Sequence, residues 1–516
     1  MSQAATLEGA ARGRLRLPAV SLASVLLGFA ALQIAAYLNA GVFEYPLDDV
    51  YIHLAVAEQI AAGGYGVNPG EYASAASSPV YPLLLVPFAG SEAQRFLPLV
   101  WNIAALAACG WLWGRILVQA GYDTADRAFG VLLAVAVPLV LNLPGIAYIG
   151  MEHTLHTATS LAVILGLLVL VDENRVSPWL IAGVLLGPAM RFEALAISGL
   201  AALFLILRGH VRAGFLCGVG ALAVAGLFTA FLVSLGLDPL PSSVQAKLGA
   251  SASLSDRVAE TFQTPLKRNT VLLIGALLAA LLLLRQVPSN AARRALLPFI
   301  ALALLAHLVA GKTGWMNRYE NYILVASVSG LLACAAAATP IAKAQALLPV
   351  ALAAAVYTPE FILKYPHATR TIDRQQAQMA RFAQDFHVGP VAVNDIGRVA
   401  WGNRHYVLDL WGLGSLDALR YRRSGDTDRW AGLLAEQHGI NLAMIYDAWL
   451  GAQIGENWVR LGQLELEGPS DYAHQSQVAF YAASSDVAPG LLAKIQEWQH
   501  GLPEGAYFVP EPEALR

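Results

Sequence analysis

The sequence has little charge. Only 13% of its 516 residues are Asp, Glu, Lys or Arg, and 57% are hydrophobic. Soluble proteins typically contain about 25% charged residues, so the composition indicates an integral membrane protein. The formal net charge is −3, which gives no sign of nucleic-acid binding. The three cysteines, Cys109, Cys217 and Cys334, lie in apolar runs without a CxxC motif, so neither a disulfide framework nor a zinc site is expected.

The sequence also lacks Lys and Arg over a long stretch after its first arginines. Arg12, Arg14 and Arg16 precede an apolar run over residues 18–41, and no Lys or Arg follows until Arg95. The run is longer than the roughly 7–15 residues of a signal-peptide core, so we expect a first transmembrane helix with a cytoplasmic N-terminus. The cation-free loop 42–78 then lies outside the membrane.

Later apolar runs predict a polytopic α-helical membrane protein with about eleven spans. The segment 79–90 is short and rich in proline, so it is counted with 96–118 as one crossing. The other expected spans are 129–148, 153–171, 178–190, 194–207, 213–236, 270–285, 294–311, 322–339 and 344–358.

The positive-inside rule supports this register, because the loops expected inside carry most of the arginines. The sequence of region 178–207 allows two interpretations. It forms either two short helices meeting at the outer face around Arg191 and Glu193, or one long tilted helix with a buried ion pair that reverses the topology of everything after it.

The composition changes near residue 360. Strand-like runs at 390–393, 406–408, 442–445 and 478–481 are partly separated by helical patterns at 427–438 and 489–500. This alternation predicts a small C-terminal α/β domain, residues 360–516, outside the membrane after the helical module 1–359. Asp395 and Asp409 stand at strand ends, and Trp401 and Trp411 either stack on sugar rings or pack the core.

Asp48 and Asp49 are the main chemical candidates. Pro46 and two acids before a helix over roughly 50–62 are also ordinary helix-start signals, in which one Asp caps the helix and the other complements its dipole. However, Asp49 and His53 are four residues apart and share a helix face. An acidic pair at the bilayer edge can bind a divalent cation or act as a general base.

Other polar residues flank spans on the same expected face. Arg191 and Glu193 are either a structural ion pair or part of a site, and Lys247, the first lysine of the chain, either reaches lipid phosphate or binds a substrate phosphate. The same choice applies to Arg318, which suits bidentate phosphate binding. The full set of candidates for substrate binding is His53, Glu152, His153, Arg191, Glu193, Lys247, Arg318 and Glu320.

Several short motifs resemble the polytopic GT-C glycosyltransferases, and among them the terminal arabinofuranosyltransferases of the mycobacterial cell wall and related bacterial envelope enzymes. These motifs are Asp-Asp-x-Tyr-Ile at 48–52, Asn-Pro-Gly-Glu at 68–71, Ser-Ser-Pro at 77–79, Gly-Met-Glu at 150–152, Leu-Pro-x-x-x-x-Ala-Lys at 240–247, Arg-Tyr-Glu at 318–320, Asn-Asp-Ile-Gly at 394–397 and Leu-Asp-Leu-x-Gly-Leu at 408–413. The chain departs from the pattern at His53, at Phe192 in Arg-Phe-Glu, and at Ser242-Ser243.

The resemblance implies a transferase that moves a hexose or pentose from a polyprenyl-phosphate donor to an envelope glycan, glycolipid or protein on the outer face of the bacterial inner membrane. Asp48 or Asp49 is then the catalytic base, and Asp49 and Glu152 are candidate ligands of a divalent metal such as Mg or Mn. Arg191, Lys247 and Arg318 are candidates for the donor phosphate. Membrane lipids are the other expected partners, and nucleic acid is not one.

Two other functions compete with this interpretation. A transporter or flippase of a lipid-linked or polar solute should carry charges near mid-membrane and often an internal repeat, whereas here polar residues lie mostly at span ends. A membrane scaffold with an outer binding domain would not require Asp48 or Asp49.

Overall fold

The computed structural model describes residues 3–124, 126–248, 268–289, 291–425, 428–468, 472–473 and 475–512. The chain forms two compact units, each assembled from distant segments of the sequence. The first unit holds Met1–Ala35, Leu99–Phe228 and Ser253–Lys364, and the second holds Ala36–Pro98, Thr229–Ala252 and Tyr365–Arg516. The first loop therefore belongs to the same unit as the C-terminal residues.

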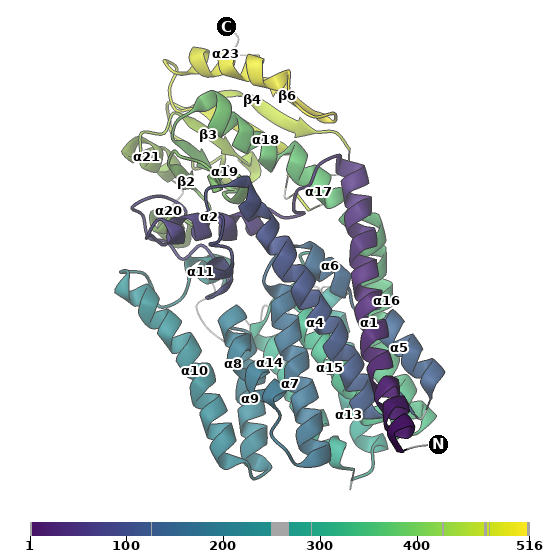
Figure 1. Cartoon of the computed structure of the whole chain (residues 1–516). Helices are drawn as coiled ribbons and strands as arrows, with labels where there is room; N and C mark the ends of the chain where they lie inside the picture. Colours follow the sequence, from purple (N-terminus) through teal and green to yellow (C-terminus); the bar gives the residue numbers. More distant parts are fainter. Residues whose placement is uncertain are drawn as a thin grey trace. The chain divides into compact units, whose positions relative to one another are not determined.

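The first unit is a bundle of apolar helices (Figure 1). Among the described residues, seven helical segments are long and apolar enough to cross a membrane, by length and composition: Arg16–Ala40, Glu92–Ala120, His153–Glu173, Val211–Ser234, Arg268–Gln286, Ala292–Ala310 and Pro340–Leu363. The helices that carry these segments are α1 (Gln3–Ala40), α4 (Leu97–Ala120), α7 (His153–Glu173), α10 (Val211–Ser234), α13 (Arg268–Gln286), α14 (Leu296–Ala310) and α16 (Pro340–Leu363). The chain is thus a polytopic helical membrane protein.

Four shorter apolar helices complete the set: α5 (Arg127–Val140), α8 (Pro178–Met190), α9 (Ala194–Leu207) and α15 (Asn321–Ala335). Each predicted span contains a helix, while the number of membrane crossings stays a prediction. The expected span 129–148 is interrupted at Asn142, whose φ of 62° starts the separate helix α6 (Leu143–Tyr148). In 79–90 the only regular helix is the four-residue α3 (Tyr81–Leu84).

Residues 178–207 form two helices and not one. Arg191 has extended backbone angles, φ −152° and ψ 142°, which ends α8 before α9 begins. The Ser198 hydroxyl of α9 donates to the Val184 carbonyl of α8 at 2.9 Å, so α9 folds back on α8. The choice left open by the sequence is therefore decided in favour of two short helices.

Buried helix α7 lies at the centre of the first unit, and α15 is buried along its whole length. Small residues allow this packing, because helices in membranes associate through close backbone approach. At Gly166 of α7 an added Cβ would lie 2.4 Å from the Leu180 Cβ of α8.

The second unit is built on a mixed six-stranded sheet with the order β2-β1-β3-β5-β4-β6. Strands β2, β1 and β3 are parallel, and β3, β5, β4 and β6 are antiparallel. The strands are β1 (Val391–Val393), β2 (Val407–Asp409), β3 (Leu442–Ile445), β4 (Val459–Leu466), β5 (Gln477–Ala482) and β6 (Ala506–Pro510). Helices pack against the sheet around a core that includes Trp430, Leu408 and Ile445 (Figure 1).

The remaining helices of the second unit come from both halves of the sequence. Those from the first loop and from residues 229–252 are α2 (Asp49–Ala61), α3, the 3-10 helix η1 (Glu92–Phe96) and α11 (Ser242–Leu248). Those after residue 365 are α17 (Tyr365–Arg374), α18 (Gln376–Arg381), the π-helix η3 (Phe382–His387), α19 (Gly397–Ala400), α20 (Leu416–Ser424), α21 (Trp430–Gln437), α22 (Asp447–Leu450) and α23 (Ala488–Gln499). A further 3-10 helix, η2 (Ala292–Ala295), precedes α14 in the first unit.

Candidate active site around the first-loop acids

Asp48 precedes α2 but does not cap that helix with its side chain. Its two carboxylate oxygens instead accept hydrogen bonds from the backbone N–H groups of Gly397 and Arg398, both at 2.7 Å. Two backbone N–H groups thus converge on one carboxyl group. Asp48 therefore ties the first loop to the turn that follows strand β1.

Gly397 has a steric reason to lack a side chain. A Cβ at this position would lie 2.1 Å from the Asp48 carbonyl oxygen and 2.8 Å from Asp48 Oδ2. The first contact is with backbone, which cannot swing away as a long side chain can. The Asn-Asp-Ile-Gly motif thus includes a glycine that the close approach of the first loop requires.

Asp395 supplies a second carboxylate beside Asp48. Burial raises the pKa of Asp48 most, the charge of Asp395 raises it further, and the two backbone hydrogen bonds lower it, so the net pKa lies well above the usual range. Asp395 is itself held in place, because its Oδ2 accepts from the Tyr446 hydroxyl at 2.6 Å and from the Gln376 amide at 3.0 Å. Burial and the charge of Asp395 thus favour the protonated form of Asp48.

Asp49 is the first residue of α2 and is partly exposed. His53 is one turn further along the same helix, as the spacing predicted, but it is only 2% exposed. Its Nε2 lies 3.4 Å from the Ser77 hydroxyl, and its ring meets that of Tyr81 edge-on with centroids 5.3 Å apart. The imidazole is thus seated among residues of the Ser-Ser-Pro segment.

A buried ion cluster on the same loop was not recognised in the sequence. Glu44 accepts from the Tyr51 hydroxyl and pairs with Arg95 at 3.1 Å and Arg398 at 3.5 Å. Burial raises the pKa of Glu44, and the two arginines oppose that rise. The only sequence signal was Arg95 as the first cation after Arg16, because its acidic partner lies some fifty residues earlier.

The Asn-Pro-Gly-Glu motif binds the edge strand of the sheet, β2. The side-chain amide of Asn68 accepts from the Val407 N–H at 2.9 Å, donates to the Val407 carbonyl at 3.0 Å and donates to Glu71 at 3.0 Å. The Asn68 amide thus pairs with both backbone groups of Val407, as a residue of a neighbouring strand would do. The motif therefore has a structural role at strand β2.

The Leu-Pro-Ser-Ser segment joins the same unit. The Ser242 N–H donates to the Ser74 hydroxyl at 2.8 Å, and the Ser242 hydroxyl donates to the Leu413 carbonyl at 2.6 Å. Lys247 follows in α11, but its side chain lies outside the part of the chain that the structure describes. Its role as a phosphate ligand stays a prediction.

The acids and tryptophans of the C-terminal motifs have structural partners. Asp409 accepts from the N–H groups of Trp411, Leu413 and Gly414 at 2.5–2.8 Å, which shapes the turn after β2. Burial raises the pKa of Asp409 to about 6, against the effect of these bonds. Trp401 is 3% exposed and donates from its indole nitrogen to Gln94, so it packs the core. Trp411 is stacked on the Arg422 guanidinium 3.4 Å from its ring centroid.

The first unit holds a second polar cluster at the helix ends. Arg191 Nη1 donates to Glu152 at 2.6 Å, and Arg191 Nη2 and Nε donate to the two oxygens of Glu193 at 2.6 and 3.2 Å. Side-chain exposure is 8% for Arg191, 0% for Glu152 and 35% for Glu193. A guanidinium bound by two carboxylates has its charge compensated, which favours the structural interpretation of this ion pair.

Arg318 and Glu320 differ in their surroundings. The Arg318 guanidinium contacts Met151 Sδ at 2.8 Å and the Tyr319 hydroxyl at 3.0 Å, and it lies 5.0 Å from the Tyr319 ring centroid. His153 meets the same ring edge-on at 6.0 Å. Glu320 is fully buried and accepts from Asn269, the Gly314 N–H and Tyr357 at 2.5–2.8 Å, so it serves the packing of this unit.

A metal site does not emerge from the described side chains. Within the described part of the chain no three His, Cys, Asp or Glu side chains come together as ligands. Glu152, one of the two predicted ligands, is bonded to Arg191. Metal dependence stays a prediction, and the chemistry below uses no metal.

These features define a class of protein: a polytopic helical membrane protein in which an acidic first loop is bonded to a mixed α/β unit. Residues 369–481 match a family model described as "Domain of unknown function (DUF8728)", which covers less than half of the chain. A search of curated proteins gave no match.

Among solved structures, the chain is similar to ArnT from Cupriavidus metallidurans bound to undecaprenyl phosphate. The sequence identity is 13%, the match covers 89% of this chain and 98% of that one, and the TM-score is 0.48. Such values do not establish a common fold, so the function has to be argued from the residues of this chain.

Proposed function

We propose that the protein is a GT-C-type glycosyltransferase that moves a sugar from a polyprenyl-phosphate donor to a hydroxyl group of an envelope glycan or glycolipid. Three observations support the proposal: the apolar helices, the family-like motifs of the first loop, and the adjacent acids at the start of α2. A lipid-linked donor confines one reactant to the bilayer, which suits an acidic site on a loop that leaves a membrane helix.

The observation that carries the proposal furthest is the different bonding of the two acids. Both oxygens of Asp48 are engaged by backbone N–H groups, and its neighbour Asp395 competes for the same proton. Asp49 follows on the first turn of the helix and is partly exposed. We assign the base to Asp49, and to Asp48 the positioning of α2 against the turn at Gly397.

The reaction follows from these roles. Asp49 takes the proton of the acceptor hydroxyl as its oxygen attacks the anomeric carbon, a new C–O bond forms, and the bond from the anomeric carbon to the phosphate oxygen breaks. The electron pair leaves with the polyprenyl phosphate, whose growing charge needs cationic partners. We assign this task to Lys247, which belongs to the same unit as Asp49. Phosphate binding by Arg318 stays a prediction.

The direct test uses the full-length protein in lipid nanodiscs with radiolabelled polyprenyl-phosphate hexoses and pentoses and an extract of envelope glycans and glycolipids. Loss of a general base typically lowers kcat by about 10²–10⁴-fold, which is the result expected for Asp49→Asn. Glu92→Gln is the matched control, since Glu92 is 79% exposed and lies 3.5 Å from Arg95, so it contributes little to that ion pair. Full transfer by Asp49→Asn would remove the base assignment.

Asp48→Asn separates positioning from catalysis. We expect a smaller loss of kcat together with a displaced pH–rate profile, because the variant removes one member of the Asp48–Asp395 pair. Formate should restore part of the activity of Asp49→Ala and none of that of Asp48→Ala, because only a missing base can be replaced by an external carboxylate.

The transporter hypothesis is tested with the same preparation. Absence of transfer with every lipid donor, together with uptake of a polar solute into proteoliposomes, would replace the transferase by a transporter. Absence of both, with unchanged binding of an envelope glycan, would favour the scaffold.

A further inference from the structure

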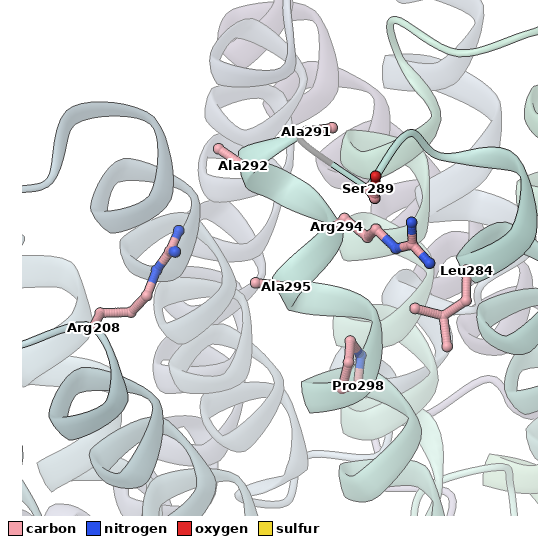
Figure 2. Close-up of a pocket in the computed structure, with 8 residues that line it drawn as sticks. All are labelled: Arg208, Leu284, Ser289, Ala291, Ala292, Arg294, Ala295 and Pro298. Atoms are coloured by element: carbon pink, nitrogen blue, oxygen red, sulfur yellow. The ribbon is translucent and has the colours of Figure 1, made fainter.

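A separate cavity lies at one end of the first unit, between the turn after α9 and the turn that joins α13 to α14 (Figure 2). Its volume is about 390 Å³. Two arginines line it, Arg208 from the end of α9 and Arg294 from η2, together with the Ser289 hydroxyl group and the apolar Leu284 and Pro298. Figure 2 shows Arg294 extending toward Leu284 on one side of η2, while Arg208 lies on the other side.

These arginines differ from their neighbour Arg293. Arg293 donates to both oxygens of Asp172 at 2.7 and 2.8 Å and to the backbone carbonyls of Gln119, Ala120 and Ala333, so it is built into the fold. In the part of the chain that the structure describes, Arg208 contacts only the Phe204 ring, 5.7 Å from its centroid, and Arg294 has no acidic partner. Two guanidinium groups with uncompensated charge thus line one cavity.

The contacts of the first unit place this cavity at a defined end of the bundle. Arg293 ties the turn before α14 to the C-terminal ends of α4, α7 and α15. His210 Nε2 lies 3.2 Å from Asn174 Oδ1, which ties the turn after α9 to the end of α7. These loops carry the arginines that the positive-inside rule predicts to face the cytoplasm.

The wall beyond the arginines is apolar and continues along both helices. Leu281 is one turn before Leu284 on α13, and Leu302 is one turn after Pro298 on α14. Their exposed fractions are 48% and 50%. A cationic cavity with exposed leucines one helical turn from its lining residues matches a molecule with a phosphate head and an apolar tail.

We propose that this cavity binds the phosphate-bearing headgroup of an anionic phospholipid from the leaflet at this end of the bundle. Arg294 and the Ser289 hydroxyl group donate to the phosphate, Arg208 adds positive charge from the other side of η2, and the acyl chains lie along the leucine-lined face. Basic pockets between membrane helices bind anionic headgroups through this combination of charge and apolar contact. The site is independent of the transfer chemistry proposed above.

A free phosphate compound would satisfy the arginines but would leave the apolar wall without a partner. The lipid is therefore favoured over a soluble phosphate. The two sources of phosphate are separated by comparing phosphatidylglycerol with glycerol 3-phosphate, which carries the same charge chemistry without acyl chains.

The test measures lipid retention by native mass spectrometry of the detergent-purified full chain, titrated with phosphatidylglycerol, phosphatidylethanolamine or glycerol 3-phosphate. The variants are Arg208→Gln and Arg294→Gln, with Arg294→Lys to retain the charge. Arg175→Gln is the control, because Arg175 belongs to the loop after α7 at the same end of the bundle and already pairs with Glu173 at 2.8 Å.

We expect phosphatidylglycerol to be retained in preference to phosphatidylethanolamine. Each Arg→Gln change should weaken its binding about fivefold, Arg294→Lys by less, and Arg175→Gln should leave it unchanged. Equal losses in all variants would show diffuse charge attraction and overturn the site. Displacement of the lipid by millimolar glycerol 3-phosphate would assign the cavity to a soluble phosphate and overturn the lipid proposal.

Unchanged melting temperatures of the variants show that loss of binding does not come from unfolding. If Arg294→Gln unfolds, Arg208→Gln and Arg294→Lys still decide the question. Glycosyl transfer is not measured in this experiment, so failure of the proposed function would leave its result unaffected.

Discussion

The contact between Gly397 and Asp48 leads us to predict that Gly397→Ala destabilises the protein, although a change from Gly to Ala in a helix usually stabilises it. In most helices a change from Gly to Ala stabilises a protein by roughly 0.5–1 kcal/mol, because alanine has the higher helix propensity and restricts the unfolded chain. Gly397 begins α19, and its φ is not in the left-handed region. Propensity alone therefore predicts that Gly397→Ala is stabilising.

The structure predicts the opposite. The new Cβ would lie 2.1 Å from the Asp48 carbonyl oxygen and 2.9 Å from its carbonyl carbon, so one of the two backbone segments has to move. Overpacking of this kind costs about 1–3 kcal/mol. The movement also lengthens the two backbone hydrogen bonds to Asp48, each contributing about 0.5–1.5 kcal/mol. We expect a net destabilisation of about 2–4 kcal/mol, in the upper part of the range for single substitutions.

Thermal unfolding of the full chain, followed by tryptophan fluorescence, measures this effect. For a unit of this size each kcal/mol changes Tm by roughly 2–4 °C, so Gly397→Ala should lower Tm by about 4–16 °C. The matched control is Gly490→Ala in α23, where an added Cβ meets no atom within 4 Å and a small rise in Tm is expected. If Gly397→Ala also raises Tm, the close approach of the first loop to this turn is refuted.

Three further predictions concern charge and topology. Because the folded chain keeps a proton near Asp48 at pH values where the unfolded chain has lost it, the free energy of unfolding should fall as pH rises from about 4 through the raised pKa. Asp395→Asn should move this fall to lower pH, and an unchanged profile of Tm against pH would contradict the acid pair. Glu152→Gln removes one of two carboxylates from a buried guanidinium and should cost about 3 kcal/mol in thermal or denaturant unfolding, whereas no measurable cost would exclude a structural ion pair. A cysteine at Glu92 should react with an impermeant maleimide in intact cells and one at Arg175 only after permeabilisation, and the reverse pattern would invert the topology. Background labelling should be low, because the three native cysteines are buried.

The helices and four of the six strands could be predicted from local patterns, and the run at 478–481 lies within β5. Each apolar run contains a helix, and the runs of valine, alanine and leucine at 391–393, 407–409 and 442–445 form strands because they are buried on both faces. Strands β4 and β6 were missed. Strand β4 mixes buried with partly buried residues, and β6 mixes buried with exposed residues. Gly462, with φ 147°, accompanies a shift of register in β4 that interrupts its pattern.

The site was predicted only in part, since composition and spacing cannot report distant partners. The sequence marked Asp48 and Asp49 as an acidic pair on a cation-free loop, and it marked Asp395 as an acid at a strand end. The sequence offered no reason to place Asp395 beside the first-loop acids. Trp401, a candidate for sugar stacking, is instead a core residue bonded to Gln94.

The amino-acid sequence by itself determined that the chain is built from apolar helices, because long apolar runs satisfy their backbone groups in a bilayer by forming helices. It also determined where acids and arginines stand along the chain. Only the tertiary structure decided which of two adjacent aspartates is held by backbone N–H groups and which arginines keep an uncompensated charge. Those properties depend on residues far apart in the sequence, such as Asp48 with Gly397 and Arg293 with Asp172. Burial and charge pairing exist only once the folded chain brings such residues together.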